Sequence, residues 1–343
     1  LNYVHEVNFQ KFYQTTTSDS QLAMAFTDEG GLYNLIYEIV GMLYESLIYD
    51  EYLVDKYMLC RRIVDGTVTS VDLITASKST REIVSQMKSV SNKMGFRSPN
   101  YNPAGIRKAN RFEDLITIMD TDFEGAMSTE VLATSYYRND AELKTGLRLI
   151  DGFSSTDEAR LTELLGSAYV QFTDAEKAEL AKVKAVIVAK EWFMDYDYLL
   201  DNASSYKETE FYNPTTLENN HFLHAWRVFS TSPFEQAVVF IADTVPAVSS
   251  VTVTPSSGTV LQGSSLQMSA VVATVGFANK AVTWSVVDST TLEPVDGVTI
   301  DENGLLKVAS TVANNLEFTV TAKSVFDSTK SDTATISTPV VAS

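Results

Sequence analysis

Two pairs of polar side chains stand close enough along the chain to suggest chemistry, and the first is His221 and His224. Two histidines at this H-x-x-H spacing share one face of a helix and could bind a metal there. Residues 220–230 read as a strand, however, on which the same spacing points the rings to opposite faces. We therefore predict no joint metal site, with one packed and one solvent-facing histidine.

The second pair is Asp195 and Asp197, within residues 191–200. Two carboxylates can hydrolyse a glycosidic bond when they converge in a cleft. Directly after a strand they are more typical of a turn, where a carboxylate accepts backbone N–H groups. The prediction is a structural role for both.

Other signals of catalysis are weak. Cys60 is the only cysteine, so the chain has no cysteine pair for zinc and no internal disulfide, which indicates a reducing cytoplasm or assembly there. Its apolar surroundings predict a buried, inert thiol. Gly30 and Gly31 lack the lysine and spacing of a phosphate-binding loop. We predict no catalytic, cofactor-binding or metal-binding residue, and a protein that is not an enzyme.

Composition narrows the class further. The chain has 343 residues, 45% of them hydrophobic, and a formal net charge of −18. This charge opposes general binding to nucleic-acid phosphates and to anionic lipid, and it favours solubility. No apolar run is long enough to span a bilayer. The first residue is Leu1 and no signal-peptide pattern follows it, so we expect that preceding residues are missing.

The sequence divides into two predicted domains. Every tyrosine lies at or before Tyr212, arginine is absent after Arg227, and Ser, Thr, Val and Ala dominate the rest. We place the first domain at 1–243, a short linker at 244–248 and the second domain at 249–343. The candidate site residues are those of the interdomain linker: Asp243, Thr244, Val245 and Pro246. Rigid packing of Val245 and Pro246 against both domains would favour a bracing role for the second domain.

The first domain reads as α+β. Its main feature is a long helix, because Leu32, Leu35, Ile36, Ile39, Val40, Leu43 and Leu47 recur at helical spacing. This helix is apolar nearly all round and ends at Asp65-Gly66, so we expect neighbours on more than one face. Further helices are predicted at about 80–93, 128–137 and within 154–183. Strands are predicted at 67–75, 114–120, 147–153, 183–193, 220–230 and 236–242.

The second domain reads as all-β. Apolar and polar residues alternate with period two between turns marked by glycine and proline, as in a small antiparallel sandwich. The segments resemble the bacterial Ig-like domain of group 2: VTVTP (251–255), SLQMSAVV (265–272), VTWSV (282–286), IDENGLLKV (300–308), FTVTAKS (318–324) and DTATIS (332–337). Such a module usually supports or displays something.

Segments of the first domain resemble the major capsid protein of phi-29-like short-tailed phages: FYQTTTSDSQLAMAF (12–26), RFEDLITIMDTDFEGAMSTEVLA (111–133), LIDGF (149–153), KEWFMDYDYL (190–199) and HAWRVFSTSPFEQAVVFIADTVPAV (224–248). The resemblance implies a coat domain of the Hong Kong 97 fold with a long spine helix, joined to the Ig-like domain. It also implies an N-terminal arm and an extended loop before Leu1.

The resemblance further implies the function. The protein would assemble with copies of itself into pentamers and hexamers of an icosahedral or prolate head that encloses double-stranded DNA. Its partners would be a scaffolding protein and a portal during assembly, with packaged DNA bound non-specifically at most, and no membrane or cofactor. It would be located in the virion after assembly in the bacterial cytoplasm. The Ig-like domain would brace capsomers or contact the host, and the short linker favours bracing.

Two other functions remain open from the residues. A bacterial surface adhesin with an Ig-like domain predicts a secretion signal, further repeats and a wall anchor. A cell-wall hydrolase with an accessory β-domain predicts a convergent carboxylate or metal cluster.

Overall fold

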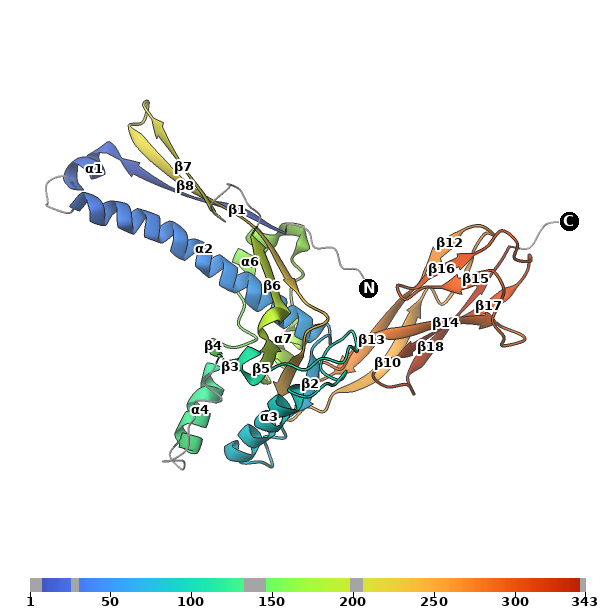
Figure 1. Cartoon of the computed structure of the whole chain (residues 1–343). Coiled ribbons are helices and arrows are strands. Elements are labelled where there is room, and N and C mark those ends of the chain that lie inside the picture. The colour runs from blue at the N-terminus through green and yellow to red at the C-terminus, as the bar shows by residue number, and fades with distance from the viewer. Residues whose placement is uncertain (1–7, 26–30, 133–145, 198–205, 340–343) are drawn as a thin grey trace.

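The computed structural model describes residues 8–25, 31–132, 146–197 and 206–339. Within them the fold is mixed α/β, with several separate sheets and one very long helix (Figure 1). The α-helices are α1 Asp19–Ala25, α2 Gly31–Val64, α3 Thr80–Met94, α4 Thr121–Leu132, α6 Glu158–Leu165 and α7 Asp174–Leu180.

Helix α2 confirms the predicted long helix. Its 34 residues make it about 51 Å long at 1.5 Å per residue. It ends where Gly66 adopts a φ of 71° and donates its N–H to the carbonyl of Ile63. Its C-terminal third packs on more than one side, as expected, whereas one side of its first two thirds is open. The large residues exposed there are Tyr37, Met42, Ile48, Tyr49 and Tyr52.

A five-stranded mixed sheet forms the centre of the first 241 residues. Its order is β2 Thr69–Asp72, β9 Ala237–Ile241, β5 Val183–Ala189, β3 Leu115–Asp120 and β4 Leu147–Ile150. Side chains of β5 alternate between its two faces. Val186 and Val188 pack with the C-terminal part of α2, whereas Ala185 and Ile187 pack with α3. The strands are therefore buried on both sides, which explains their nearly continuous apolar runs.

A second sheet lies along the first half of α2 (Figure 1). Its longest strand is β8 Glu218–Thr231, which pairs with β1 Phe9–Ser18 on one edge and with β6 Phe193–Asp197 and β7 Tyr206–Asn213 on the other. One face contacts α2 through a core of Phe9, Tyr13, Leu43, Leu47, Val54, Leu223, Ala225 and Phe229. The ring of Phe9 meets that of Phe229 edge-on at 5.4 Å. We call α2 up to Asp55 together with this sheet the arm.

All elements after Pro246 are strands, and they surround a core of their own that includes Val251, Leu306, Phe318 and Ile336. The strands are β10 Ala247–Thr254, β11 Ser257–Thr259, β12 Ser265–Gln267, β13 Ser269–Val275, β14 Val282–Asp288, β15 Val298–Ile300, β16 Leu305–Val308, β17 Glu317–Ser324 and β18 Ser331–Ser337. They form three small sheets: β10-β13, β11-β18-β17-β14 and β12-β16-β15.

Several sequence predictions need correction at their boundaries. The helix predicted at 128–137 starts earlier, at Thr121, and its part after Leu132 lies outside the described residues. The strand predicted at 183–193 ends at Ala189, where a single 3-10 turn precedes β6. Strands β1 and β7 were not predicted, because their polar residues conceal the alternation that the other strands display.

Candidate functional site

His221 and His224 point to opposite faces of β8, as predicted, so they do not form a joint metal site. His221 lies on the face of β8 that packs toward α2 and His224 on the outer face, which agrees with one packed and one outward ring, although both are partly buried. His221 lies beside Thr17 at 3.1 Å and Glu210 at 3.2 Å, while His224 lies 3.3 Å from Thr209. Side chains of the strands on both edges of β8 therefore contact the two rings. In the part of the chain that the structure describes, no group of three or more His, Cys, Asp or Glu residues could hold a metal ion.

Asp195 and Asp197 lie in strand β6, not in a turn, so the predicted turn role was wrong. Both face α2, where they meet Glu51 and Asp55. Arg227 is placed among these carboxylates: its Nη1 is 2.9 Å from Glu51 Oε1 and its Nε is 2.7 Å from Asp197 Oδ1. Four acidic groups share this one guanidinium, and we call them the acid cluster.

Titration of the acid cluster should affect stability. Burial, together with the negative charges of Asp195 and Glu51, raises the pKa of Asp55 to about 8 against the opposing effect of Arg227. An unfolded aspartate titrates near pH ~4. Between these values the folded chain holds a proton that the unfolded chain lacks, so this contribution to stability grows as the pH falls through 8 and is absent above it.

We predict that Asp55→Asn is more stable than the parent chain at pH 8.5, by about 1–3 kcal/mol, because an amide needs no charge desolvated. At pH 5.5 the gain should be clearly smaller, because folded Asp55 is then protonated, and it should vanish only near pH ~4, where the unfolded aspartate is protonated as well. Chemical unfolding at the two pH values measures this, and Asp65→Asn at the partly exposed end of α2 is the control. A gain in stability of equal size at both pH values would contradict the raised pKa of Asp55.

Cys60 is fully buried, and its thiol donates to the carbonyl of Phe153 at 3.3 Å. Burial raises the pKa of this thiol to about 12, so it carries no thiolate at neutral pH. This confirms the predicted inert cysteine.

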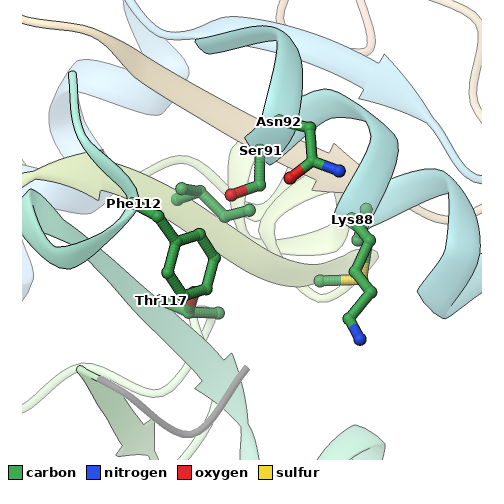
Figure 2. A pocket seen from close by; sticks show the side chains of 7 residues that line it. Lys88, Ser91, Asn92, Phe112 and Thr117 are labelled. Carbon is green, nitrogen blue, oxygen red and sulfur yellow. The ribbon is translucent and has the colours of Figure 1, made fainter. Parts of the chain in front are cut away.

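A pocket of about 310 Å³ lies between α3 and the central sheet (Figure 2). Lys88, Ser91 and Asn92 come from α3, and Phe112 and Thr117 come from the segment that leads into β3 and from β3 itself. Met87 and Ile187 add apolar surface. These side chains include no carboxylate, histidine or cysteine, and Ser91 makes no hydrogen bond to Lys88, so the lining residues form no hydrogen-bonded nucleophile–base pair.

The linker residues lie between β9 and β10. Asp243 accepts hydrogen bonds from the Thr75 hydroxyl and, at 3.0 Å, from the Ala76 N–H, while Thr244 is buried. Val245 is 69% exposed, so it does not pack against both sides. Pro246 lies against Gly276 within the strands that follow.

Contacts outside the linker join the C-terminal strands to α2. Lys280 donates from Nζ to the carbonyl of Val64 at 2.7 Å, at the end of the helix. Phe277 is buried in the core of the first 241 residues, with Val64 and Val68 among its cluster. Gly66 permits this approach, since a Cβ there would stand 2.4 Å from the carbonyl oxygen of Ala278.

We predict that Gly66→Ala loosens this contact. The alanine would have to adopt a left-handed backbone conformation, and its Cβ would collide with main-chain atoms of Ala278. The substitution should therefore cost about 2–4 kcal/mol of stability. Gly105→Ala is the matched control, because Gly105 has a similar φ of 64° but open space around it, and should cost about 1 kcal/mol. Thermal unfolding gives the stabilities, and trypsin cleavage at Lys280 should accelerate only in Gly66→Ala. Equal losses in both variants would contradict the role given to the contact.

The arm exposes aromatic residues on both of its outer surfaces. On α2 these include Tyr37 and Tyr49, and on the sheet they include Phe12, Tyr196 and Phe211. Tyrosine and phenylalanine in such patches are typical of surfaces that pack against another macromolecule. Such surfaces are what a structural or binding protein presents to its partners.

Comparisons with known proteins identify the class more closely. The profile of the family described as Phi29-like phage major capsid protein matches residues 1–241. The major capsid protein of Bacillus phage PZA is 30% identical over 317 residues, which are 91% of this chain and 63% of the relative; that of Bacillus phage B103 is 29% identical over 318 residues, with the same coverage. The chain therefore belongs to the family of phi29-like phage major capsid proteins. It spans about 63% of the length of these relatives.

The capsid structure of Staphylococcus phage Andhra is similar with a TM-score of 0.47 and 11% identity, over 68% of this chain and 70% of that one. Among the helices of the described ranges, none is both long and apolar enough to cross a membrane.

Proposed function

We propose that this chain is a coat subunit that assembles with copies of itself into the pentamers and hexamers of an icosahedral or prolate phage head around double-stranded DNA. The family match over residues 1–241 carries this proposal. The exposed aromatic surfaces of the arm support it, because a shell subunit needs large faces for repeated copies. The role is structural and not enzymatic, and the subunit is located in the virion.

The proposal includes two domains. Residues 1–243 would form a coat domain of the Hong Kong 97 type with α2 as its spine helix, and residues 249–343 an Ig-like domain of group 2 on the outer surface, joined by 244–248. The separate core of the C-terminal strands supports this division. Asp243, Thr244, Val245 and Pro246 would act as the interdomain linker, in which Asp243 and Thr244 are held and Val245 is exposed.

The Ig-like domain would brace the shell. Lys280, Phe277 and Gly66 tie it to the end of α2, which favours a fixed attachment over a free appendage. Contact with the host is the other use of an outer domain. A scaffolding protein and a portal would take part in assembly, and the charge of −18 opposes more than non-specific contact with the packaged DNA.

Electron microscopy of the full-length protein, expressed in bacteria with the scaffolding protein of its phage, tests the proposal. Closed shells with five- and six-fold clusters, each subunit bearing an outer knob, are the expected result. A protein that sediments as a monomer under these conditions contradicts it and would favour a surface-binding protein. Loss of the knob in shells of a variant truncated after residue 243 would locate the second domain.

A further inference from the structure

The arm has two layers, and each layer has one face that the chain itself leaves open. Helix α2 and the sheet of β1, β8, β6 and β7 pack on each other through their inner faces. Figure 1 shows α2 running beside β1, β7 and β8 as an elongated projection from the central sheet. The outer faces of this projection therefore belong to residues far apart in the sequence.

The outer face of α2 is aromatic and acidic. Its large residues are Tyr37, Met42, Ile48, Tyr49 and Tyr52, which are 81%, 52%, 62%, 50% and 40% exposed. They recur at helical spacing on the side opposite the buried Leu43 and Leu47. Glu38 and Glu45 are exposed on the same side. No lysine or arginine occurs between residues 31 and 55, so this face has no positive charge of its own.

The outer face of the sheet is aromatic, and among its strand residues the one acidic side chain is Glu218 at the start of β8. Directly paired residues of neighbouring strands share a face, and His224 of β8 pairs with Phe12 of β1 and Lys207 of β7. Phe12 and Phe211 are each 61% exposed. The outward positions of β8 from Asn220 to Val228, and their partners on both edges, include no carboxylate. Lys207 is exposed there and supplies a positive charge.

These two faces complement each other, whereas neither complements itself. Two copies joined helix to helix would bring Glu38 and Glu45 against the same glutamates, and two copies joined sheet to sheet would oppose their lysines. Joined helix to sheet, the aromatic residues of both faces meet and the glutamates gain a cation.

We propose that the outer face of α2 in one subunit docks on the outer face of the β1-β8-β6-β7 sheet in the next subunit. Such a contact joins two different surfaces, so it repeats from copy to copy and forms a ring when the rotation between copies closes, as the proposed pentamers and hexamers require. The proposal rests on the proposed function, since the occupant is a second copy of this chain. It adds which surfaces meet and in which direction.

Cross-linking in assembled heads tests the direction. Cys60 is fully buried and bonded, so introduced cysteines are the only accessible ones among the described residues. Heads of the double variant Ile48→Cys, Phe211→Cys are treated with a short bis-maleimide and analysed on denaturing gels. We expect a ladder from dimers up to the complete ring, and no cross-linked species from either single variant.

The outcomes separate the inference from the proposed function. Dimers from Ile48→Cys alone would overturn the helix-to-sheet arrangement in favour of helix-to-helix contact. Heads of the double variant that stay monomeric on the gel would overturn it as well. Failure of the parent chain to form heads would instead contradict the proposed function, and the inference with it.

Charge reversal provides a second measurement that does not depend on cysteine variants. Lys207→Glu should reduce the yield of heads at least tenfold, because the sheet face would then repel Glu38 and Glu45. Adding Glu45→Lys to the same chain should restore most of the yield, since each contact then contains both changes. Lys307→Glu, at an exposed position among the C-terminal strands, is the control and should leave the yield unchanged. A failure of Glu45→Lys to rescue Lys207→Glu, with both variants folded, would overturn the proposal.

Discussion

Replacing Arg227 by methionine should destabilise the chain by about 3–5 kcal/mol, because four carboxylates would lose the cation that they share. Arg227 is mostly buried, with its side chain 17% exposed, and it contacts Glu51 and Asp197. Its guanidinium also donates to the Tyr206 hydroxyl at 2.6 Å and lies 5.4 Å from the centre of that ring. Methionine keeps most of the volume, so the loss would be mainly electrostatic.

The pH dependence makes this prediction specific. Burial already raises the pKa values of Glu51 and Asp195 in the parent chain. Without Arg227 they rise further, so Arg227→Met should regain stability as the pH falls from 8 to 5, and adding Asp55→Asn should recover part of the loss at pH 8. Urea unfolding at several pH values measures both effects. Arg61→Met, at a partly exposed ion pair with Asp65, is the control and should cost at most about 1 kcal/mol. A loss that is independent of pH would show that packing, and not charge, explains it.

Arg160→Ala should also cost about 3–5 kcal/mol, although the residue lies in a short surface helix. Asp50 of α2 is 1% exposed, and Arg160 binds its two oxygens from Nε at 2.8 Å and Nη2 at 2.6 Å. Tyr13 of β1 donates to the same carboxylate at 2.6 Å, and burial with this bond raises its pKa well above the ordinary value. Without Arg160, the buried Asp50 carboxylate would keep the Tyr13 hydroxyl, a neutral donor, but lose its cation.

The matched control uses the second partner of Arg160. Glu163 lies 2.7 Å from Nη1 but is 68% exposed, so Glu163→Gln should change stability by at most about 0.5 kcal/mol. Asp50→Asn combined with Arg160→Ala should be more stable than Arg160→Ala alone, because the orphaned charge is gone. Thermal unfolding of the parent chain, Asp50→Asn, Arg160→Ala and the double variant gives the coupling energy between the two side chains. Strict additivity of the two changes would contradict a direct interaction.

The ion pair between Arg160 and Asp50 shows how the segment 154–183 is attached to α2, which the sequence did not reveal. The segment was predicted as a mostly helical insertion, and α6 and α7 confirm the helices. Its attachment could not be predicted, because the ion pair joins residues 110 positions apart that carry no local pattern. The same limit applies to the acid cluster, whose members come from α2, β6 and β8. Asp195 and Asp197 alone looked like a turn, since Glu51, Asp55 and Arg227, which they meet, are distant in the sequence.

The elements that could be predicted are those with strong local periodicity. Helix α2 and strands β3, β8 and β9 were placed within a few residues, because core packing imposes their apolar patterns. The open face of α2 could not be predicted for a related reason. An apolar helix side that binds another molecule has the same composition as one that is covered by its own chain, so the sequence alone cannot distinguish the two.

Three contacts at the junction near the end of α2 involve main-chain atoms on at least one side. Lys280 binds the carbonyl of Val64, Asp243 accepts the N–H of Ala76, and Gly66 lies beside the carbonyl of Ala278. Main-chain groups are present whatever side chain a residue carries. Relatives that diverge at Val64, Ala76 and Ala278 can therefore retain the same placement of the C-terminal strands. The distant loops of those strands can then vary among relatives, as long as Gly66, Lys280, Asp243 and the buried Phe277 are retained.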